Sequence, residues 1–122
     1  MAERTSPTVL HIRVRLRVPP DEVLAQSCEV AEKIAQLEGL IWKIWVVERE
    51  KREMGGVYLF ASRENAVAYL NHPIVQALCS NPAVMAADSQ IWYVEGSLSA
   101  ITRGPLGSVR AEEQELVMAG GR

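Results

Sequence analysis

Apolar and polar residues alternate strictly in the segment 9–18, which is the clearest pattern in the chain. One set of alternate positions is wholly aliphatic, from Leu10 to Val18, whereas the other set holds His11 and three arginines. A period of two places the two sets on opposite faces of a β-strand. The pattern therefore predicts a half-buried strand with an apolar face and a basic face.

The segments that follow change between helical and strand patterns. Pro20 opens the first helical pattern, in which apolar residues recur at three- and four-residue spacing until Gly39, a residue suited to a left-handed C-terminal cap. Ser62 is placed as the N-cap of a second helix, and Pro73 opens a third. In chain order, the sequence predicts strand, helix, strand, strand, helix, short helix and strand over residues 9–18, 20–39, 40–48, 56–61, 63–70, 74–79 and 83–95.

This order is a split βαβ pattern, which is typical of a ferredoxin-like α+β sandwich. We expect one domain over residues 1–102, built as a four-stranded antiparallel sheet with helices on one face. Residues 103–122 form a polar C-terminal extension with one apolar cluster at 116–118. This extension is expected to be flexible or to pack as an arm against a partner.

The second strand has apolar residues on both of its faces, with Lys43 as the exception. Lys43 and Trp45 share one face, and Trp42 lies on the other. Because the helices can cover only one face of the sheet, the other face needs a separate cover. A second copy of the chain is the simplest cover, and two sheets meeting across a two-fold axis would form a barrel.

Composition narrows the class of protein. The chain has 122 residues and a formal net charge of −2, so it fits one domain and has no general attraction to nucleic acid or to anionic membranes. No apolar run approaches the roughly 18 residues of a membrane span, and no secretory signal is visible, so a cytoplasmic protein is expected. Cys28 and Cys79 lie in apolar helical patterns and are expected to be buried thiols.

Candidate chemistry falls first on the polar face of the first strand. His11 could act as a general base, because the pKa of a histidine can lie near neutrality; the alternative is a histidine hydrogen-bonded inside a dimer interface. Arg13 could bind an anion; the alternative is an ion pair with an acidic residue such as Glu48 or Glu95. No metal-ligand spacing, phosphate-binding glycine loop or nucleophile motif occurs.

Aromatic residues of the other strands are the second group of candidates. Trp45, Tyr58 and Trp92 could form a platform for a planar ligand, with Lys43 beside them. Aromatic side chains at strand spacing are also typical of a protein core or an interface, and the sequence leaves both interpretations open.

Three strings of residues resemble a known family. They are Gly39-Leu-Ile-Trp-Lys-Ile-Trp, Gly55-Gly-Val-Tyr-Leu-Phe and Ala66-Val-Ala-Tyr-Leu. Together they resemble the YdhR-type monooxygenase family, part of the dimeric α/β-barrel superfamily that includes the antibiotic-biosynthesis monooxygenases. The resemblance extends over about residues 9–101. The arginine-rich first strand and the tail beyond Thr102 depart from the family pattern.

The resemblance implies a homodimeric barrel with a pocket on the non-helical face of each sheet. It also implies a cofactor-independent monooxygenase that uses dioxygen on a small aromatic or enolisable substrate, with no metal. In that hypothesis His11 deprotonates the substrate, and the residues that bind it are Arg13, Lys43, Trp45, Tyr58 and Trp92. The alternatives are a non-catalytic dimer that binds an aromatic or anionic metabolite, and a structural protein whose barrel is filled.

Overall fold

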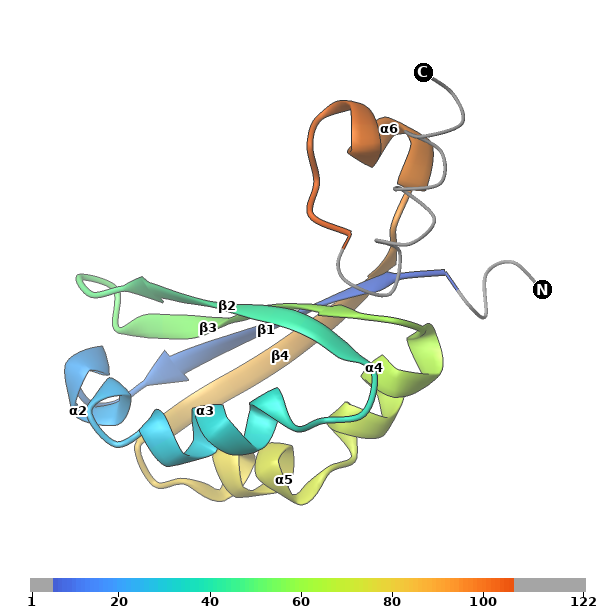
Figure 1. The fold of residues 1–122 in the computed structure, drawn as a ribbon. Helices are drawn as coiled ribbons and strands as arrows, with labels where there is room; N and C mark the ends of the chain where they lie inside the picture. The colour runs from blue at the N-terminus through green and yellow to red at the C-terminus, as the bar shows by residue number, and fades with distance from the viewer. Residues whose placement is uncertain (1–5, 107–122) are drawn as a thin grey trace.

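A computed structural model describes residues 6–106 of the chain (Figure 1). The helices and strands, in chain order, are β1 (Thr8–Leu16), α2 (Pro20–Leu24), α3 (Cys28–Ala35), β2 (Leu40–Glu48), β3 (Glu53–Phe60), α4 (Arg63–Leu70), α5 (Pro73–Ser80), β4 (Val84–Tyr93) and α6 (Gly96–Ile101). The apolar cluster predicted at 116–118 lies outside the described residues.

The four strands form one antiparallel sheet in the order β2-β3-β1-β4. Helices α3, α4 and α5 cover one face of this sheet, and α6 stands away from the helix layer at the far end of β4 (Figure 1). The ferredoxin-like fold predicted from the order of elements is confirmed. None of the helices within residues 6–106 has the length and apolar character needed to cross a membrane.

The core lies between the sheet and the helices. The alternate residues of β1 from Leu10 to Leu16 are almost completely buried, as the alternation predicted. Phe60 of β3 and Ala66 of α4 are fully buried against them. β1 begins at Thr8 and ends at Leu16, two residues before the predicted end, where its register with β4 shifts.

The predicted helix over 20–39 is wrong in its extent, because the structure has two short helices there. The hydroxyl of Ser27 donates a hydrogen bond of 2.8 Å to the carbonyl oxygen of Val23, at the break between α2 and α3. A serine that bonds the backbone in this way competes with helix continuation. Gly39 has the expected left-handed backbone, with φ of 81°, but it follows the end of α3 by several residues and leads directly into β2.

The start of α4 follows from the sequence, whereas the two cysteines do not lie as predicted. The hydroxyl of Ser62 accepts a hydrogen bond from the backbone N–H of Asn65, so Ser62 is the N-cap of α4. Cys28 and Cys79 are both exposed, and the prediction of buried thiols is wrong. Both helices turn other residues toward the sheet, and the helical spacing places the cysteines on the outer side.

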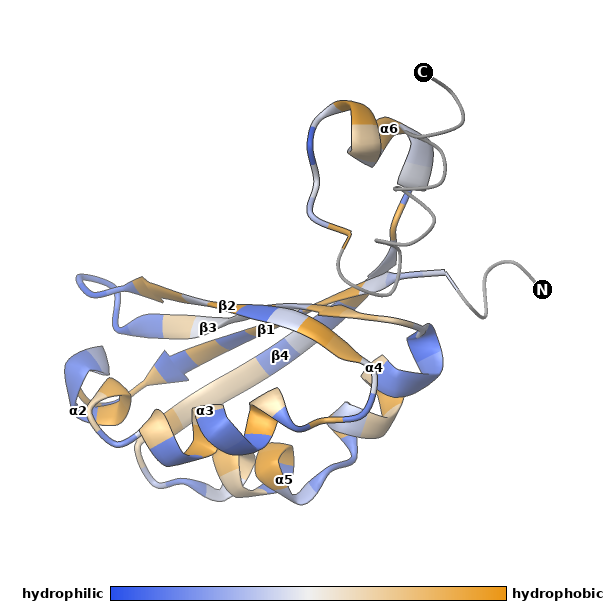
Figure 2. Cartoon of the chain, in the orientation of Figure 1, coloured by the Kyte–Doolittle hydropathy of each residue, from blue (hydrophilic) through white to orange (hydrophobic). Residues whose placement is uncertain are grey.

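The face of the sheet opposite the helices is open within one chain. Ile44, Val46 and Trp92 are its exposed apolar side chains, and Trp92 has 57% of its surface exposed. Figure 2 shows hydrophobic residues along β2 and again in α6, away from the helix layer. We refer to this side of the sheet as the open face and to the other side as the helix face.

Candidate functional site

The register of the sheet assigns Lys43, Trp45 and Tyr58 to the helix face. Lys43 lies opposite Tyr58, which lies opposite the buried Leu10. Directly opposed residues of an antiparallel pair share a face, so all three point to the same side as Leu10. Trp45 follows Lys43 by two residues and joins them.

The same register assigns the other predicted site residues to the open face. His11 lies opposite Gln90, and Trp92 lies opposite Val9, whose neighbours in the alternation are His11 and Arg13. The sheet therefore separates His11, Arg13 and Trp92 from the helix-face group. The predicted arrangement, in which His11, Arg13 and Trp45 surround one substrate, is not present within one chain.

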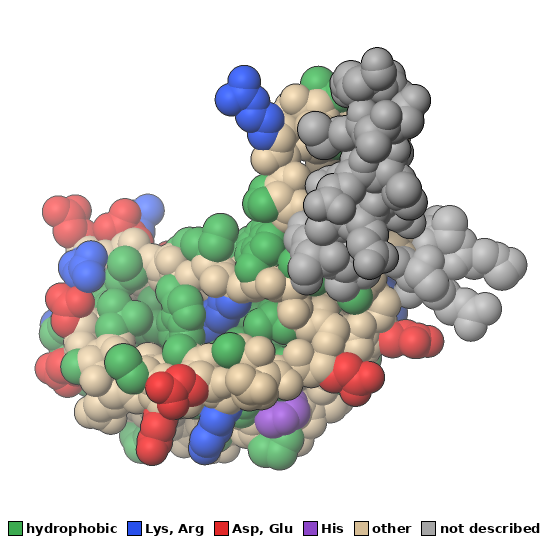
Figure 3. Space-filling model, viewed as in Figure 1, with side chains coloured by type: hydrophobic (Ala, Val, Ile, Leu, Met, Phe, Trp, Pro, Cys, Tyr) green, Lys and Arg blue, Asp and Glu red, His purple; other side chains and the backbone are tan. Residues whose placement is uncertain are grey.

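A cavity of about 390 Å³ lies on the helix face, between the sheet and helices α2, α3 and α5. Figure 3 shows it as a hollow between β2 and α3, with hydrophobic walls and a basic side chain inside it. The apolar lining includes Ile12, Val14, Val30, Ile34, Ile74 and Leu78. This cavity lies on the side of the sheet opposite to the pocket that the resemblance implies. One reason is Gly56, which has no side chain to fill the space between sheet and helices.

Lys43 is the basic residue of the cavity lining. Its Nζ lies 3.4 Å from the ring centroid of Trp45 and 4.7 Å from that of Tyr58, so the ammonium rests on two aromatic faces. Burial lowers the pKa of Lys43 from 10.5 to about 8, because the cavity wall replaces water around the ammonium. No ion pair between described residues involves Lys43.

Gly56 makes the position of Lys43 possible. A Cβ added at Gly56 would lie 2.5 Å from Cε of Lys43 and 2.9 Å from the ring of Tyr58. Both distances are too short for carbon atoms, so any larger residue would displace the lysine stem or the tyrosine ring. The glycine thus fixes where the ammonium lies.

Tyr58 and Tyr69 add a pair of hydroxyl groups. Their oxygens lie 3.1 Å apart, and the centroids of their rings lie 5.0 Å apart. Burial raises the pKa of both phenols, so both stay neutral near neutral pH and can donate or accept a hydrogen bond. Both residues line the cavity, which therefore has a neutral hydrogen-bonding pair in addition to one cation.

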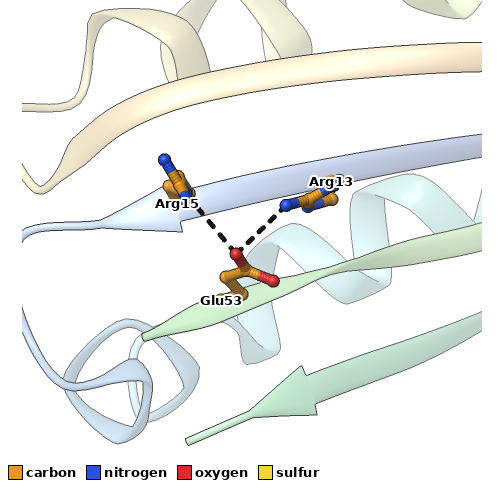
Figure 4. A network of polar contacts seen from close by, with 3 residues as sticks. All are labelled: Arg13, Arg15 and Glu53. Carbon is orange, nitrogen blue, oxygen red and sulfur yellow. Dashed lines mark hydrogen bonds and ion pairs between the residues drawn. The ribbon is translucent and has the colours of Figure 1, made fainter. Parts of the chain in front are cut away.

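The arginines of the open face pair with one carboxylate. Arg13 and Arg15 reach the same Glu53 oxygen at 3.2 and 3.4 Å (Figure 4). The hydrogen bond from Arg13 is the main cause that lowers the pKa of Glu53, opposed by desolvation and supported by the charges of both arginines. The ion-pair alternative is confirmed for Arg13, although the partner is Glu53 and not Glu48 or Glu95.

Two residues of the cavity were missed as site candidates. Tyr69 lies in the helix predicted over 63–70, and the sequence does not pair it with Tyr58 because it does not fix the position of that helix on the sheet. Gly56 begins the strand predicted over 56–61 but lies inside β3, where a glycine is a signal of close approach by another group. Among residues 6–106, no cluster of three or more His, Cys, Asp or Glu residues could hold a metal ion.

Solved structures show the same fold. SnoaB, a cofactor-independent oxygenase from Streptomyces nogalater, is 13% identical with a TM-score of 0.60, over 76% of this chain and 97% of that one. The ActVA-Orf6 monooxygenase of Streptomyces coelicolor, in complex with nanaomycin D, is 15% identical with a TM-score of 0.60, over 76% and 91%. MhuD, a heme degrader from Mycobacterium tuberculosis, is 19% identical with a TM-score of 0.54, over 71% and 95%.

The family is shown by the sequence itself. No curated protein matches the chain at a significant level. The profile of the family described as "Putative mono-oxygenase ydhR" matches residues 9–105, which is most of the chain and includes the four strands of the sheet except Thr8. The chain belongs to this ydhR mono-oxygenase family.

Proposed function

We propose that the chain is a cofactor-independent monooxygenase that acts with dioxygen on a small aromatic or enolisable substrate. We place the substrate in the helix-face cavity and the enzyme in the cytoplasm as a homodimer. The observation that carries this proposal is the cavity itself: about 390 Å³, aromatic and aliphatic walls, and Lys43 as a cation with no ion-pair partner among the described residues. Its volume lies within the range of small-molecule sites, roughly 300–1,000 Å³.

The substrate supplies all the electrons in this reaction. Loss of a proton from a methylene group next to a carbonyl or a phenolic ring gives an anion that can reduce dioxygen. Conversion of that methylene group to a carbonyl removes four electrons and two hydrogens; one oxygen atom enters the product and the other leaves as water. Flavin or metal is not required for this balance.

We assign to Lys43 the stabilisation of the substrate anion. Its ammonium lies in the cavity and holds the negative charge that develops when the substrate loses its proton to solvent. Trp45 supplies a flat wall for an aromatic ring, and the hydroxyls of Tyr58 and Tyr69 can bond an oxygen of the substrate.

The open face supports the homodimer. Ile44, Val46 and Trp92 expose apolar surface on the side of the sheet that α3, α4 and α5 leave uncovered. An exposed apolar sheet face of this kind is typical of a protein–protein interface. The mate that fits it is a second copy in a two-fold arrangement, since the same face then covers itself. Residues 103–122 remain proposed as a C-terminal extension, although the carbonyl oxygen of Pro105 accepts a hydrogen bond of 2.7 Å from Nε1 of Trp42 in β2.

Oxygen uptake tests the proposal. The purified protein is incubated with a panel of phenols, quinols and 1,3-dicarbonyl compounds in an oxygen electrode, with tryptophan quenching recorded in parallel. We expect at least one compound to give oxygen consumption that Lys43→Met lowers strongly. Saturable quenching without oxygen uptake would instead identify a ligand-binding dimer, and the absence of both would indicate a filled domain with no ligand.

A further inference from the structure

The cavity holds one positive charge that its own walls do not neutralise. Lys43 is the basic residue of the lining, and no ion pair between described residues includes it. Its ammonium instead rests on the rings of Trp45 and Tyr58. Aromatic faces attract a cation but do not replace a counter-ion, so the charge is open to an incoming anion.

The other groups around the cavity do not supply that counter-ion. The titratable residues of the lining, besides Lys43, are Glu22 of α2, Tyr58 of β3 and Tyr69 of α4. Glu22 is exposed to solvent, and the two phenols are neutral because burial raises their pKa. The lining residues of β1, α3 and α5 are uncharged. An anionic ligand would therefore meet a cation at Lys43 and neutral donors at the tyrosines.

We infer that the substrate class of this site is the planar aromatic acids, which the Lys43 ammonium binds through an anionic oxygen while Trp45 and the aliphatic walls enclose the ring. The acid can be a carboxylic acid or an acidic phenol, because both present the same anionic oxygen. Lys43 is thus the specificity-determining residue as well as the stabilising cation. This inference narrows the proposed function and rests on it for the use of the cavity as the substrate site.

Three matched probes separate the contribution of the ligand's charge to the binding affinity from that of its aromatic ring. The probes are 2-naphthoate, 2-naphthamide and cyclohexanecarboxylate, titrated against the full chain by tryptophan quenching and calorimetry. The amide keeps the ring and removes the charge, whereas the cyclohexane acid keeps the charge and removes the aromatic ring. We expect 2-naphthoate to bind about tenfold or more tightly than either of the other two, the gain typical of a charge-assisted contact.

Two variants and a pH titration then test whether the preference for naphthoate arises from the charge of Lys43. Lys43→Met should remove the preference for naphthoate over naphthamide, whereas Lys33→Met, which changes an exposed lysine of α3 outside the cavity, should keep it. In the wild-type chain, naphthoate binding should weaken as the pH rises through about 8, because Lys43 loses its proton, and naphthamide binding should stay constant.

Equal affinity for naphthoate and naphthamide in the wild-type chain would overturn the inference, and this comparison needs no variant to fold. Full retention of the naphthoate preference in Lys43→Met would also overturn it. The proposed oxygenase is judged separately by oxygen uptake. Oxygen consumption with neutral substrates alone would support the proposed monooxygenase and contradict the aromatic acid as its substrate class. Preferential binding of naphthoate without oxygen consumption would support the acid-binding site and contradict the monooxygenase.

Discussion

The two faces of the sheet carry basic residues in different electrostatic states. On the open face, Arg13 and Arg15 share the carboxylate of Glu53, and all three are accounted for by pairing. On the helix face, Lys43 is partly buried and has no carboxylate partner within residues 6–106. A paired surface charge is typical of structure, whereas an unpaired cation in a cavity marks a site for a ligand.

The two faces also differ in packing. Hydrophobicity alone would suggest a filled space under the helices and a polar surface on the open face, but neither is found. The helix face is covered by helices yet encloses the cavity, while the open face has apolar residues with no cover in one chain. The amount of exposed apolar surface on a face of the sheet therefore does not indicate whether that face binds a small molecule. We expect the open face to bind a second copy and the helix face to bind the substrate.

The largest expected effect comes from a charge placed on the open face. Val46 and Val47 are neighbours in β2 with nearly equal exposure, 38% and 37%, but they lie on opposite faces. Val46→Asp should weaken the homodimer about a hundredfold or more, because an unpaired carboxylate would be buried in the interface. Analytical ultracentrifugation over a range of concentrations measures the dissociation constant.

Val47→Asp is the matched control and should leave the dissociation constant close to that of the wild-type chain. A wild-type chain that sediments as a monomer at high concentration would contradict the dimer altogether. Equal weakening by both substitutions would show that loss of the strand, and not the choice of face, causes the dissociation.

The second effect separates the two candidate catalytic groups. Lys43→Met should lower kcat/KM for oxygen uptake about tenfold or more, because the cation beside the developing anion is lost. His11→Ala should change it by less than about twofold, because the sheet lies between His11 and the cavity. The assay compares the initial rates of the two variants at several substrate concentrations.

The assignment of His11 as a general base stays a prediction until this comparison is made. A large loss of turnover in His11→Ala, with ligand binding and dimerisation intact, would restore that assignment. It would move the reaction to the open face.

A smaller effect concerns stability. The pKa of Lys43 is about 8 in the folded chain and about 10.5 in an ordinary lysine, so the unfolded chain binds more protons between these values. Wild-type stability should therefore rise with pH from about 8 to about 10.5 relative to Lys43→Met, and Lys43→Met should be the more stable protein near neutral pH. Urea unfolding at about pH 7 and about pH 10 measures the difference. A constant difference between the two proteins at both values would contradict the lowered pKa.

The smallest effect lies at the ion pairs of the open face. Glu53→Gln removes the shared partner of Arg13 and Arg15, and the unfolding midpoint should fall only slightly because both arginines are exposed to solvent. Since pairing lowers the pKa of Glu53, its contribution is present at neutral pH and disappears as the pH falls through the lowered value. Thermal unfolding from neutral to acidic pH, with Glu32→Gln as the control, checks both statements. A loss that persists at low pH would show a cause other than the carboxylate charge.

The fold was predictable where the two faces of a strand differ chemically. In β1 one set of alternate residues is aliphatic and the other set holds His11 and the arginines. The alternation therefore predicts both the strand and which of its faces is buried. In β2 both sets are apolar, and alternation alone could not say whether Lys43 or Trp42 faces the helices. The answer comes from the register with β3, in which Lys43 lies opposite Tyr58.

That register depends on the charged turn between β2 and β3. The third strand was predicted to begin at Gly56, but it begins at Glu53, and Glu48 lies opposite Glu53 across the turn. The turn is completed by Arg52 in a left-handed backbone conformation, with φ of 55°, which is not a position that a sequence pattern marks for arginine. Because the predicted third strand begins at Gly56, it leaves out Glu53, and the sequence therefore does not identify Glu53 as the partner of Arg13 and Arg15.

The central position of β1 has a consequence for how the protein is made. β1 is the first of the four strands of this sheet to be synthesised, yet Thr8 pairs with Phe60 on one side and with Tyr93 on the other. The β2–β3 hairpin can form early from neighbouring residues, whereas the middle of the sheet must wait for the last strand to be synthesised. During that wait one edge of β1 has no partner strand, so we expect newly made chains to depend on chaperones more than a sheet of sequential hairpins would.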